Sequence, residues 1–259
     1  MADSGHDPRE DTARTQHVDE SKSAVLLCHG FTGSPVSMEP WAQALREAGH
    51  EVSVPLLAGH GTSWQDLAQT DWADWYASLA VAHAELLGRH DRVVLGALSM
   101  GGALSLRLAA RFPDRVAGLM LVNPAVGSKD PRIPLAGLLK RLVATTPAIA
   151  NDTNKPGTNE GAYSRTPTAA VEQLHDLWQD LRPRLSGVRQ PVLLLRSTVD
   201  HVVDDRSEEL LMTSLASENL RRVSLPNSYH VATLDNDADV IATESVRFLA
   251  ELDQAADRG

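Results

Sequence analysis

Ser99, Asp200 and His230 each follow a short apolar run of strand type. A serine hydroxyl is a poor nucleophile until a base takes its proton. Imidazole titrates near neutrality, so His230 can accept that proton and return it to a leaving group. Asp200 would hold the tautomer of the histidine and stabilise its imidazolium form. The three residue types therefore predict acyl transfer through a covalent acyl-enzyme.

The residues around Ser99 have the composition of a sharp strand-to-helix turn. An apolar run at 93–95 leads into the serine, and a helical pattern of small and apolar residues starts at Ala103. The positions two before and two after the serine, Ala97 and Gly101, are small enough for a tight turn. The usual pattern is G-x-S-x-G, and we expect the extra methyl group of Ala97 to be tolerated. Taken alone, the pattern leaves open an ordinary loop serine.

Two backbone amides are predicted to bind the oxygen that becomes negatively charged during acyl transfer. A helix that begins just after Ser99 points free N–H groups toward the serine. The sequence His-Gly-Phe-Thr-Gly at 29–33 follows another apolar run. We therefore predict that the amides of Phe31 and Met100 form the oxyanion hole and are the substrate-binding groups. No residue of the inserted segment described below can be assigned to the substrate.

Strands that alternate with helices would position these residues. Strand patterns occur at residues 24–28, 51–55, 93–95, 117–122, 191–195 and 220–225. Helical patterns occur at residues 34–48, 71–89, 103–109, 168–185, 205–215 and 237–253. This alternation predicts an α/β fold, a mostly parallel sheet with helices on both faces. Sites in such sheets form beyond the carboxyl ends of the strands, where the residues above are expected.

Two segments depart from the alternation. Residues 1–22 are rich in Asp, Glu and His and lack the apolar stretch of a signal peptide, so we predict a disordered acidic leader. Residues 126–167 show no clear strand, and only 133–143 has the pattern of a short amphipathic helix. We interpret 126–167 as an insertion at the carboxyl edge of the sheet, where insertions form lids. The apolar part of this insertion could instead face substrate or an interface.

The composition excludes several classes of partner. The chain has 259 residues and a net charge of −10, without a Lys/Arg cluster, which argues against nucleic acid and anionic membrane surfaces. Its single cysteine, Cys28, cannot form an intramolecular disulfide. No segment is long and apolar enough to span a bilayer, and no metal-spaced Cys/His cluster occurs. We expect a cytoplasmic protein without stable membrane insertion or a metal; the oligomeric state stays open.

The order of the motifs resembles a known family. An oxyanion loop, a nucleophile, an acid and a histidine follow one another in the order of α/β-hydrolase triads. The chain resembles the small bacterial carboxylesterases and thermostable monoacylglycerol lipases of that superfamily. The matching segments are HGFTG at 29–33, GHG at 59–61, LSMGG at 98–102, STVDH at 197–201 and SYHVATLD at 228–235. The Leu-Asp pair that ends the last segment is a feature of the family rather than of the superfamily.

The resemblance implies a single α/β-hydrolase domain over 23–259 with a small cap at 126–167. It implies a serine ester hydrolase that acts on short- to medium-chain esters and monoacylglycerols and needs no cofactor. In this interpretation Ser99 is the nucleophile, His230 the base and Asp200 the acid. The small-molecule ester is the expected partner.

Other side chains compete for these roles. Asp204 and Asp205 compete with Asp200, but both fit the N-cap of the next helix. Three histidines compete with His230, and we interpret all of them as structural or neighbouring groups: His29, His60 and His201. Cys28 is interpreted as an inert core thiol rather than a second nucleophile.

The same triad would serve other acyl bonds. A thioesterase, a lactonase and a cofactor-free perhydrolase remain alternatives, because the acyl-enzyme is common to all of them. A non-catalytic ligand receptor with a hydrolase fold is the contrasting class. An Asp-nucleophile dehalogenase or epoxide hydrolase is disfavoured because position 99 is serine.

Overall fold

A six-stranded parallel sheet forms the centre of the computed structural model, which describes residues 22–148, 151–256 and 258. The strands lie in the order β2-β1-β3-β4-β7-β8. Their bounds are β1 (Ala24–Cys28), β2 (Val52–Ser53), β3 (Val93–Leu98), β4 (Val116–Val122), β7 (Val192–Ser197) and β8 (Leu220–Leu225). The predicted parallel sheet is therefore confirmed, although β2 has only two residues where five were expected. The predicted leader lies, except for residue 22, outside the described residues.

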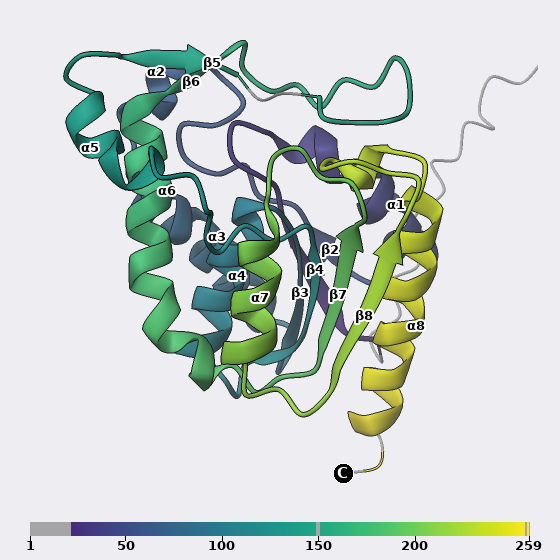
Figure 1. The fold of residues 1–259 in the computed structure, drawn as a ribbon. Coiled ribbons are helices and arrows are strands. Elements are labelled where there is room, and N and C mark those ends of the chain that lie inside the picture. The colour runs from purple at the N-terminus through teal and green to yellow at the C-terminus, as the bar shows by residue number, and fades with distance from the viewer. Residues whose placement is uncertain (1–21, 149–150, 257, 259) are drawn as a thin grey trace, which may run out of the picture.

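Helices cover both faces of the sheet, as predicted (Figure 1). Helices α3 (Trp72–Leu87), α4 (Met100–Arg111), α6 (Thr168–Leu181) and α7 (Asp205–Ser214) pack on one face. Helices α1 (Glu39–Glu47) and α8 (Ala238–Ala256) pack on the other. Alternate residues of each central strand point into one core or the other, which explains why these strands are apolar without interruption. In β1, Leu26 belongs to the first core and Leu27 to the second.

Helix starts follow from local capping chemistry. Asp71 caps α3 through a capping box with Asp74, and Asp204 caps α7 by accepting from the Arg206 amide. The N-cap prediction is confirmed for Asp204, whereas Asp205 is the first residue of α7. The helix expected at 34–48 is divided into a 3-10 turn, η1 (Pro35–Met38), and α1, with a proline near the start of each. The short helix α2 (Trp64–Leu67) was not predicted.

The 126–167 segment lies over the carboxyl edge of the sheet (Figure 1). It contains η2 (Ile133–Leu135), α5 (Ala136–Leu139) and two short antiparallel strands, β5 (Thr145–Pro147) and β6 (Arg165–Pro167). The expectation that this segment has no strand was wrong. Three-residue strands leave too little sequence for a period-two pattern, and each of these contains a proline. Two further 3-10 turns, η3 (Arg182–Gly187) and η4 (Ala232–Leu234), follow α6 and precede α8.

None of the helices in the described part of the chain is long and apolar enough to cross a membrane.

Candidate active site

The sheet topology brings the predicted residues to one edge. The strand order reverses at β1, which has β2 on one side and β3 on the other. Ligands of open α/β sheets bind at such a switch point, beyond the carboxyl ends of the strands. Residues 29–33 leave β1 there, and Ser99 leaves β3. Asp200 follows β7 and His230 follows β8 at the same edge.

Ser99 occupies a strained turn between β3 and α4. Its backbone has φ 56° and ψ −121°, a left-handed conformation that a non-glycine residue rarely adopts. Close packing holds the turn: a Cβ added at Gly101 would lie 2.4 Å from the Cys28 carbonyl oxygen and 2.7 Å from that of His29. Gly101 therefore has to be glycine. The Ala97 side chain is completely buried, and the turn forms with it in place.

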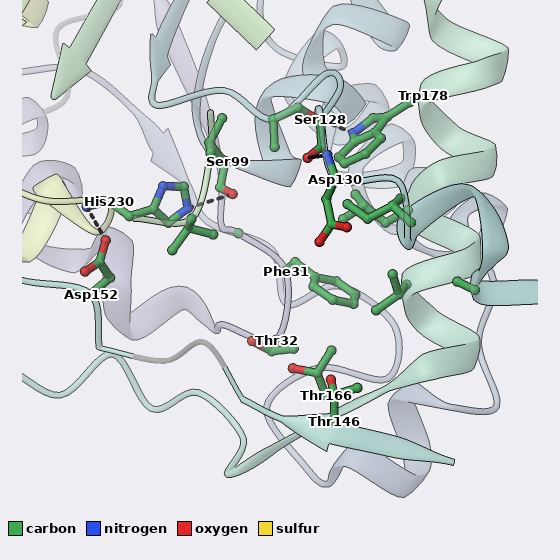
Figure 2. Close-up of a pocket in the computed structure, with 18 of the residues that line it drawn as sticks. Phe31, Thr32, Ser99, Ser128, Asp130, Thr146, Asp152, Thr166, Trp178 and His230 are labelled. Carbon is green, nitrogen blue, oxygen red and sulfur yellow. Dashed lines mark hydrogen bonds between the residues drawn. The ribbon is translucent and has the colours of Figure 1, made fainter. Parts of the chain in front are cut away.

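Ser99, His230 and Asp200 form one hydrogen-bonded chain. His230 Nε2 lies 2.9 Å from Ser99 Oγ, and His230 Nδ1 lies 3.0 Å from Asp200 Oδ2. Figure 2 shows the imidazole turned toward the serine at the wall of a cavity. With the proton on Nδ1, the ring donates to the carboxylate and its Nε2 accepts from the serine hydroxyl. This geometry can activate Ser99 as a nucleophile.

The Asp200 carboxylate is held at both oxygens. Its Oδ1 accepts from the amides of Val202 and Val203 at 2.9 and 2.8 Å. Its Oδ2 accepts from Arg196 as well as from His230. Burial by itself would raise the pKa of Asp200, but the hydrogen bond and charge of His230, the Val203 amide and the charge of Arg196 together lower it to about 2. Asp200 is therefore an anion at all pH values at which His230 can act as a base.

The loop after β1 turns sharply and passes close to Ser99. The Gly33 amide donates to the Gly30 carbonyl at 3.2 Å, and Thr32 has φ 60°, so the chain turns sharply at Phe31. Gly30 lies close enough that an added Cβ would be 3.3 Å from Ser99 Cβ. Met100 is the first residue of α4, where helix amides lack intrahelical acceptors. Phe31 and Met100 stay the predicted oxyanion donors.

Histidines 29 and 60 brace the loops instead of reaching Ser99. His29 Nδ1 donates to the Gly30 carbonyl at 3.0 Å, and its Nε2 accepts from the Leu57 amide at 3.2 Å. The His60 ring packs against the rings of His29 and Trp75. Burial lowers the pKa of His29 to about 3 and that of His60 to about 4. Cys28 is fully buried, and burial raises the pKa of its thiol, as expected for an inert core residue.

These two buried histidines predict loss of stability in weak acid. In the unfolded chain a histidine has a pKa near 6.5, so below that pH the unfolded state binds protons that the folded state does not. Each histidine should then reduce the free energy of unfolding by up to about 1.4 kcal/mol per pH unit between pH 6 and its lowered pKa. Urea unfolding at pH 7, 6 and 5 measures this slope. His29→Asn, whose amide can replace the Nδ1 donor, should give a shallower slope, and an unchanged slope would contradict the account.

A cavity of about 500 Å³ opens beside Ser99 and His230. Its walls come from the β1 and β3 loops, from α6 and from the 126–167 segment. Apolar side chains form the part against α5 and α6: Ile133, Ala136, Leu139, Val171, Leu174 and Trp178. Asp152 and Glu160 line the cavity on the His230 side, and Figure 2 shows Asp152 and Trp178 on opposite sides of Ser99. Asp130, which pairs with Arg132, also lines the cavity on the Trp178 side (Figure 2). Ser99 thus lies between a largely apolar compartment and an acidic one.

The 126–167 segment is attached directly to the histidine loop. The Asp152 carboxylate accepts from the amides of His230 and His201, both at 3.2 Å, and from His201 Nδ1 at 2.8 Å. Asp235 accepts from the Asn154 and Lys155 amides at 2.6 and 2.8 Å. His201 is therefore a partner of Asp152 and not of Ser99. The sequence offered no signal for Asp152, because its partners are far away along the chain.

Two further residues that the sequence analysis did not identify support the hydrogen-bonded chain of Ser99, His230 and Asp200. Asn123, which has φ 43°, donates to the His230 carbonyl at 2.8 Å and to Ser197 Oγ at 2.9 Å. Its Oδ1 accepts from the Ser197 amide and from Arg196 at 2.8 and 3.1 Å. The sequence did offer a sign of Arg196, because a charged residue interrupts the apolar run of β7. In the described residues, no group of three or more His, Cys, Asp or Glu side chains could hold a metal ion.

Comparisons with known proteins agree with this geometry. The family described as alpha/beta hydrolase fold matches residues 23–148. The thermostable monoacylglycerol lipase of Bacillus sp. (strain H-257) is 37% identical over 91% of this chain and 93% of its own length. The carboxylesterase of Bacillus subtilis (strain 168) is 24% identical over 89% of this chain and 93% of its own.

Solved structures are similar over the same range. A structure of the metagenome-derived lipolytic enzymes LipS and LipT has a TM-score of 0.85 and 36% identity, covering 91% of this chain and all of that one (100%). The monoacylglycerol lipase of Paleococcus ferrophilus has a TM-score of 0.76 at 18% identity, covering 91% and 96%. At that identity the second similarity concerns the fold alone.

Proposed function

The chain belongs to the alpha/beta hydrolase fold family, and from that premise we propose that Ser99, His230 and Asp200 are its catalytic residues. The protein is a serine ester hydrolase of the carboxylesterase and monoacylglycerol lipase type. The observation that carries the assignment of residues is the hydrogen-bonded chain from Ser99 Oγ through His230 to Asp200, at the wall of a cavity.

The proposed reaction has two steps. Ser99 Oγ attacks the ester carbonyl while His230 takes the hydroxyl proton, and the amides of Phe31 and Met100 bind the oxyanion. His230 then gives the proton to the leaving alcohol, and the acyl group stays on Ser99. Water activated by His230 attacks the acyl-enzyme and releases the carboxylic acid. Asp200 keeps the imidazole proton on Nδ1 throughout.

We propose that the acyl chain lies in the apolar compartment against α5 and α6. Residues 126–167 would act as a cap, because they supply part of this wall and lie over the carboxyl edge of the sheet. The segment from 151 to 155 is fixed to the histidine loop, and Ser128 and Lys129 are fixed to Asp204, so any opening of the cap would involve residues 130–147. The cytoplasmic location stays a prediction.

The leaving alcohol would lie on the acidic side, next to His230. Glu160 lines the cavity there, with 8% of its surface exposed, and accepts from the Asn151 amide at 2.6 Å. Burial raises the pKa of Glu160. A buried carboxyl group in this position suits the free hydroxyl groups of a monoacylglycerol, because hydroxyl donors satisfy it.

Glu160→Gln should therefore separate two kinds of substrate. We expect KM for a monoacylglycerol to rise about tenfold, because a charge-assisted hydrogen bond to the glycerol portion is weakened. KM for the p-nitrophenyl ester of the same acid should change little, since p-nitrophenol has no such hydroxyl group. Glu218→Gln, a surface change of the same charge, is the matched control. Equal changes for both substrates would contradict a role in binding the alcohol.

The pH–rate profile should contain one acid limb. We expect kcat/KM for a short p-nitrophenyl ester to fall through a single ionisation as the pH is lowered, because protonated His230 cannot accept the proton of Ser99. Asp200, with its pKa lowered to about 2, should add no second inflection above pH 4. Initial rates between pH 4 and 9 measure the profile, over the range in which the protein stays folded. A flat profile would argue against His230 as the base.

The substrate class is tested by turnover of monoacylglycerols and of a chain-length series of p-nitrophenyl esters. Steady hydrolysis of monoacylglycerols, with a maximum at short or medium chains, would support the proposal. Binding without turnover of any ester would favour a ligand receptor. Faster turnover of thioesters, lactones or perhydrolysis substrates would favour the corresponding alternative on the same triad.

A further inference from the structure

Arg196 is a charged residue in an otherwise apolar strand. It is the next-to-last residue of β7, whose sequence is VLLLRS and whose six residues are all buried. The Arg196 side chain is only 8% exposed. Burying a guanidinium costs free energy unless acceptors replace the lost water. Its partners therefore indicate why an arginine occupies this position.

The guanidinium binds the same carboxylate oxygen as the proposed base. Its NH1 group donates to Asp200 Oδ2, the oxygen that lies 3.0 Å from His230 Nδ1. NH1 also donates to Asn123 Oδ1 at 3.1 Å, and NH2 donates to the Val203 carbonyl oxygen at 2.5 Å. Arg196 is thus fixed by groups that themselves hold the triad. One oxygen of Asp200 is shared between a permanent cation and the imidazole.

Stability alone does not require an arginine here. Replacing a buried ion pair by well-packed apolar residues is often neutral or stabilising. A leucine at this position would continue the apolar run of β7. The arginine instead supplies two things that leucine cannot: a planar fork that ties Asp200 and Asn123, through NH1, to the Val203 carbonyl, through NH2, and a positive charge close to His230.

We propose that Arg196 is a positioning residue that fixes Asp200 and limits how strongly this carboxylate stabilises the imidazolium form of His230. The proposal rests on the proposed triad. During acyl transfer His230 becomes a cation, and a carboxylate already paired with a guanidinium attracts that cation less. His230 then stays a neutral base to lower pH than it would beside an unpaired carboxylate.

Several charged groups face this network from neighbouring elements. Glu208 on α7 lies 3.8 Å from Arg196 Nε and also pairs with Arg222. Asp205, at the start of α7, is affected by the charge of Arg196. Asp152 and Glu160 approach His230 from the 126–167 segment. All four of these are acidic and favour the imidazolium, whereas Arg196 opposes it.

Arg196→Met should raise the midpoint of the acid limb of the kcat/KM profile by roughly one pH unit. It should also lower the plateau kcat about tenfold or more, because Asp200 loses one of its constraints. Arg196→Lys keeps the charge without the planar fork, so it should retain a midpoint close to that of the wild type while kcat falls. Because Arg196→Lys changes the packing least, it keeps the test open if Arg196→Met folds poorly.

Arg222→Met is the matched control. Arg222 also pairs with Glu208, but its side chain is 38% exposed and does not contact Asp200. The substitution therefore removes the same charge without touching the carboxylate. The wild-type midpoint is expected in this variant. A midpoint in Arg196→Met equal to that of the wild type, or an equal upward shift in Arg196→Lys, would overturn the proposal. If the proposed triad itself were wrong, Ser99→Ala would remain active. That result distinguishes failure of the triad from failure of the proposal for Arg196.

Discussion

Replacing Ser99 with alanine is expected to lower kcat for every ester substrate by about 10⁴-fold or more. The hydroxyl 2.9 Å from His230 Nε2 is the proposed nucleophile, and no acyl-enzyme can form without it. Alanine keeps a Cβ in the strained turn at φ 56°, so the fold should be retained. Steady-state rates with a p-nitrophenyl ester measure the loss, and thermal unfolding checks the fold.

Ser105→Ala is the matched control for Ser99→Ala. Ser105 lies on α4, is fully buried and has a hydroxyl without a hydrogen-bond partner in the described part of the chain. Removing that hydroxyl should leave kcat close to that of the wild type. Retained activity in Ser99→Ala would refute the assignment of the nucleophile.

Asp200→Asn is expected to lower kcat by roughly 10⁴-fold while the side chain keeps its size. The amide group of asparagine can donate to His230 Nδ1, which favours the tautomer with the proton on Nε2. That tautomer cannot accept the proton of Ser99. The variant should also lose stability, because the buried Arg196 loses the closer of its two anionic partners. Rates should therefore be compared at a temperature at which the variant is folded.

Asp204→Asn tests whether the acid has been assigned to the right residue. Asp204 is four residues further along the chain and caps α7, a role that asparagine also performs well. Most of the activity should remain in this variant. A loss as large as that of Asp200→Asn would show that a general effect of charge, and not the tautomer of His230, explains the result.

The sequence predicted the parts of the site that depend on strand order. Ser99, Asp200 and His230 each follow an apolar strand, and parallel strands place their carboxyl ends at one edge. Their convergence could therefore be expected before any distance was known. The small residues around Ser99 likewise predicted the turn, because close approach of the backbone is a local requirement.

The sequence did not predict the groups that hold the triad together. Asn123 and Arg196 act through contacts between neighbouring strands, and Asp152 reaches the histidine loop from 78 residues away along the chain. Such contacts depend on the packed structure and leave no periodic pattern. The strands β5 and β6 are too short to give one. The boundary of the substrate cavity was unpredictable for the same reason, since the 126–167 segment supplies much of its wall.

The central claim is that Ser99 carries the acyl group during turnover. The most direct measurement is rapid quenching of the enzyme during hydrolysis of a p-nitrophenyl ester, followed by mass spectrometry of the intact protein and its peptides. We predict a mass increase of one acyl group on the peptide that contains Ser99, which disappears as turnover ends and is absent in Ser99→Ala. An acyl group on another residue, or continued turnover in Ser99→Ala, would contradict the account.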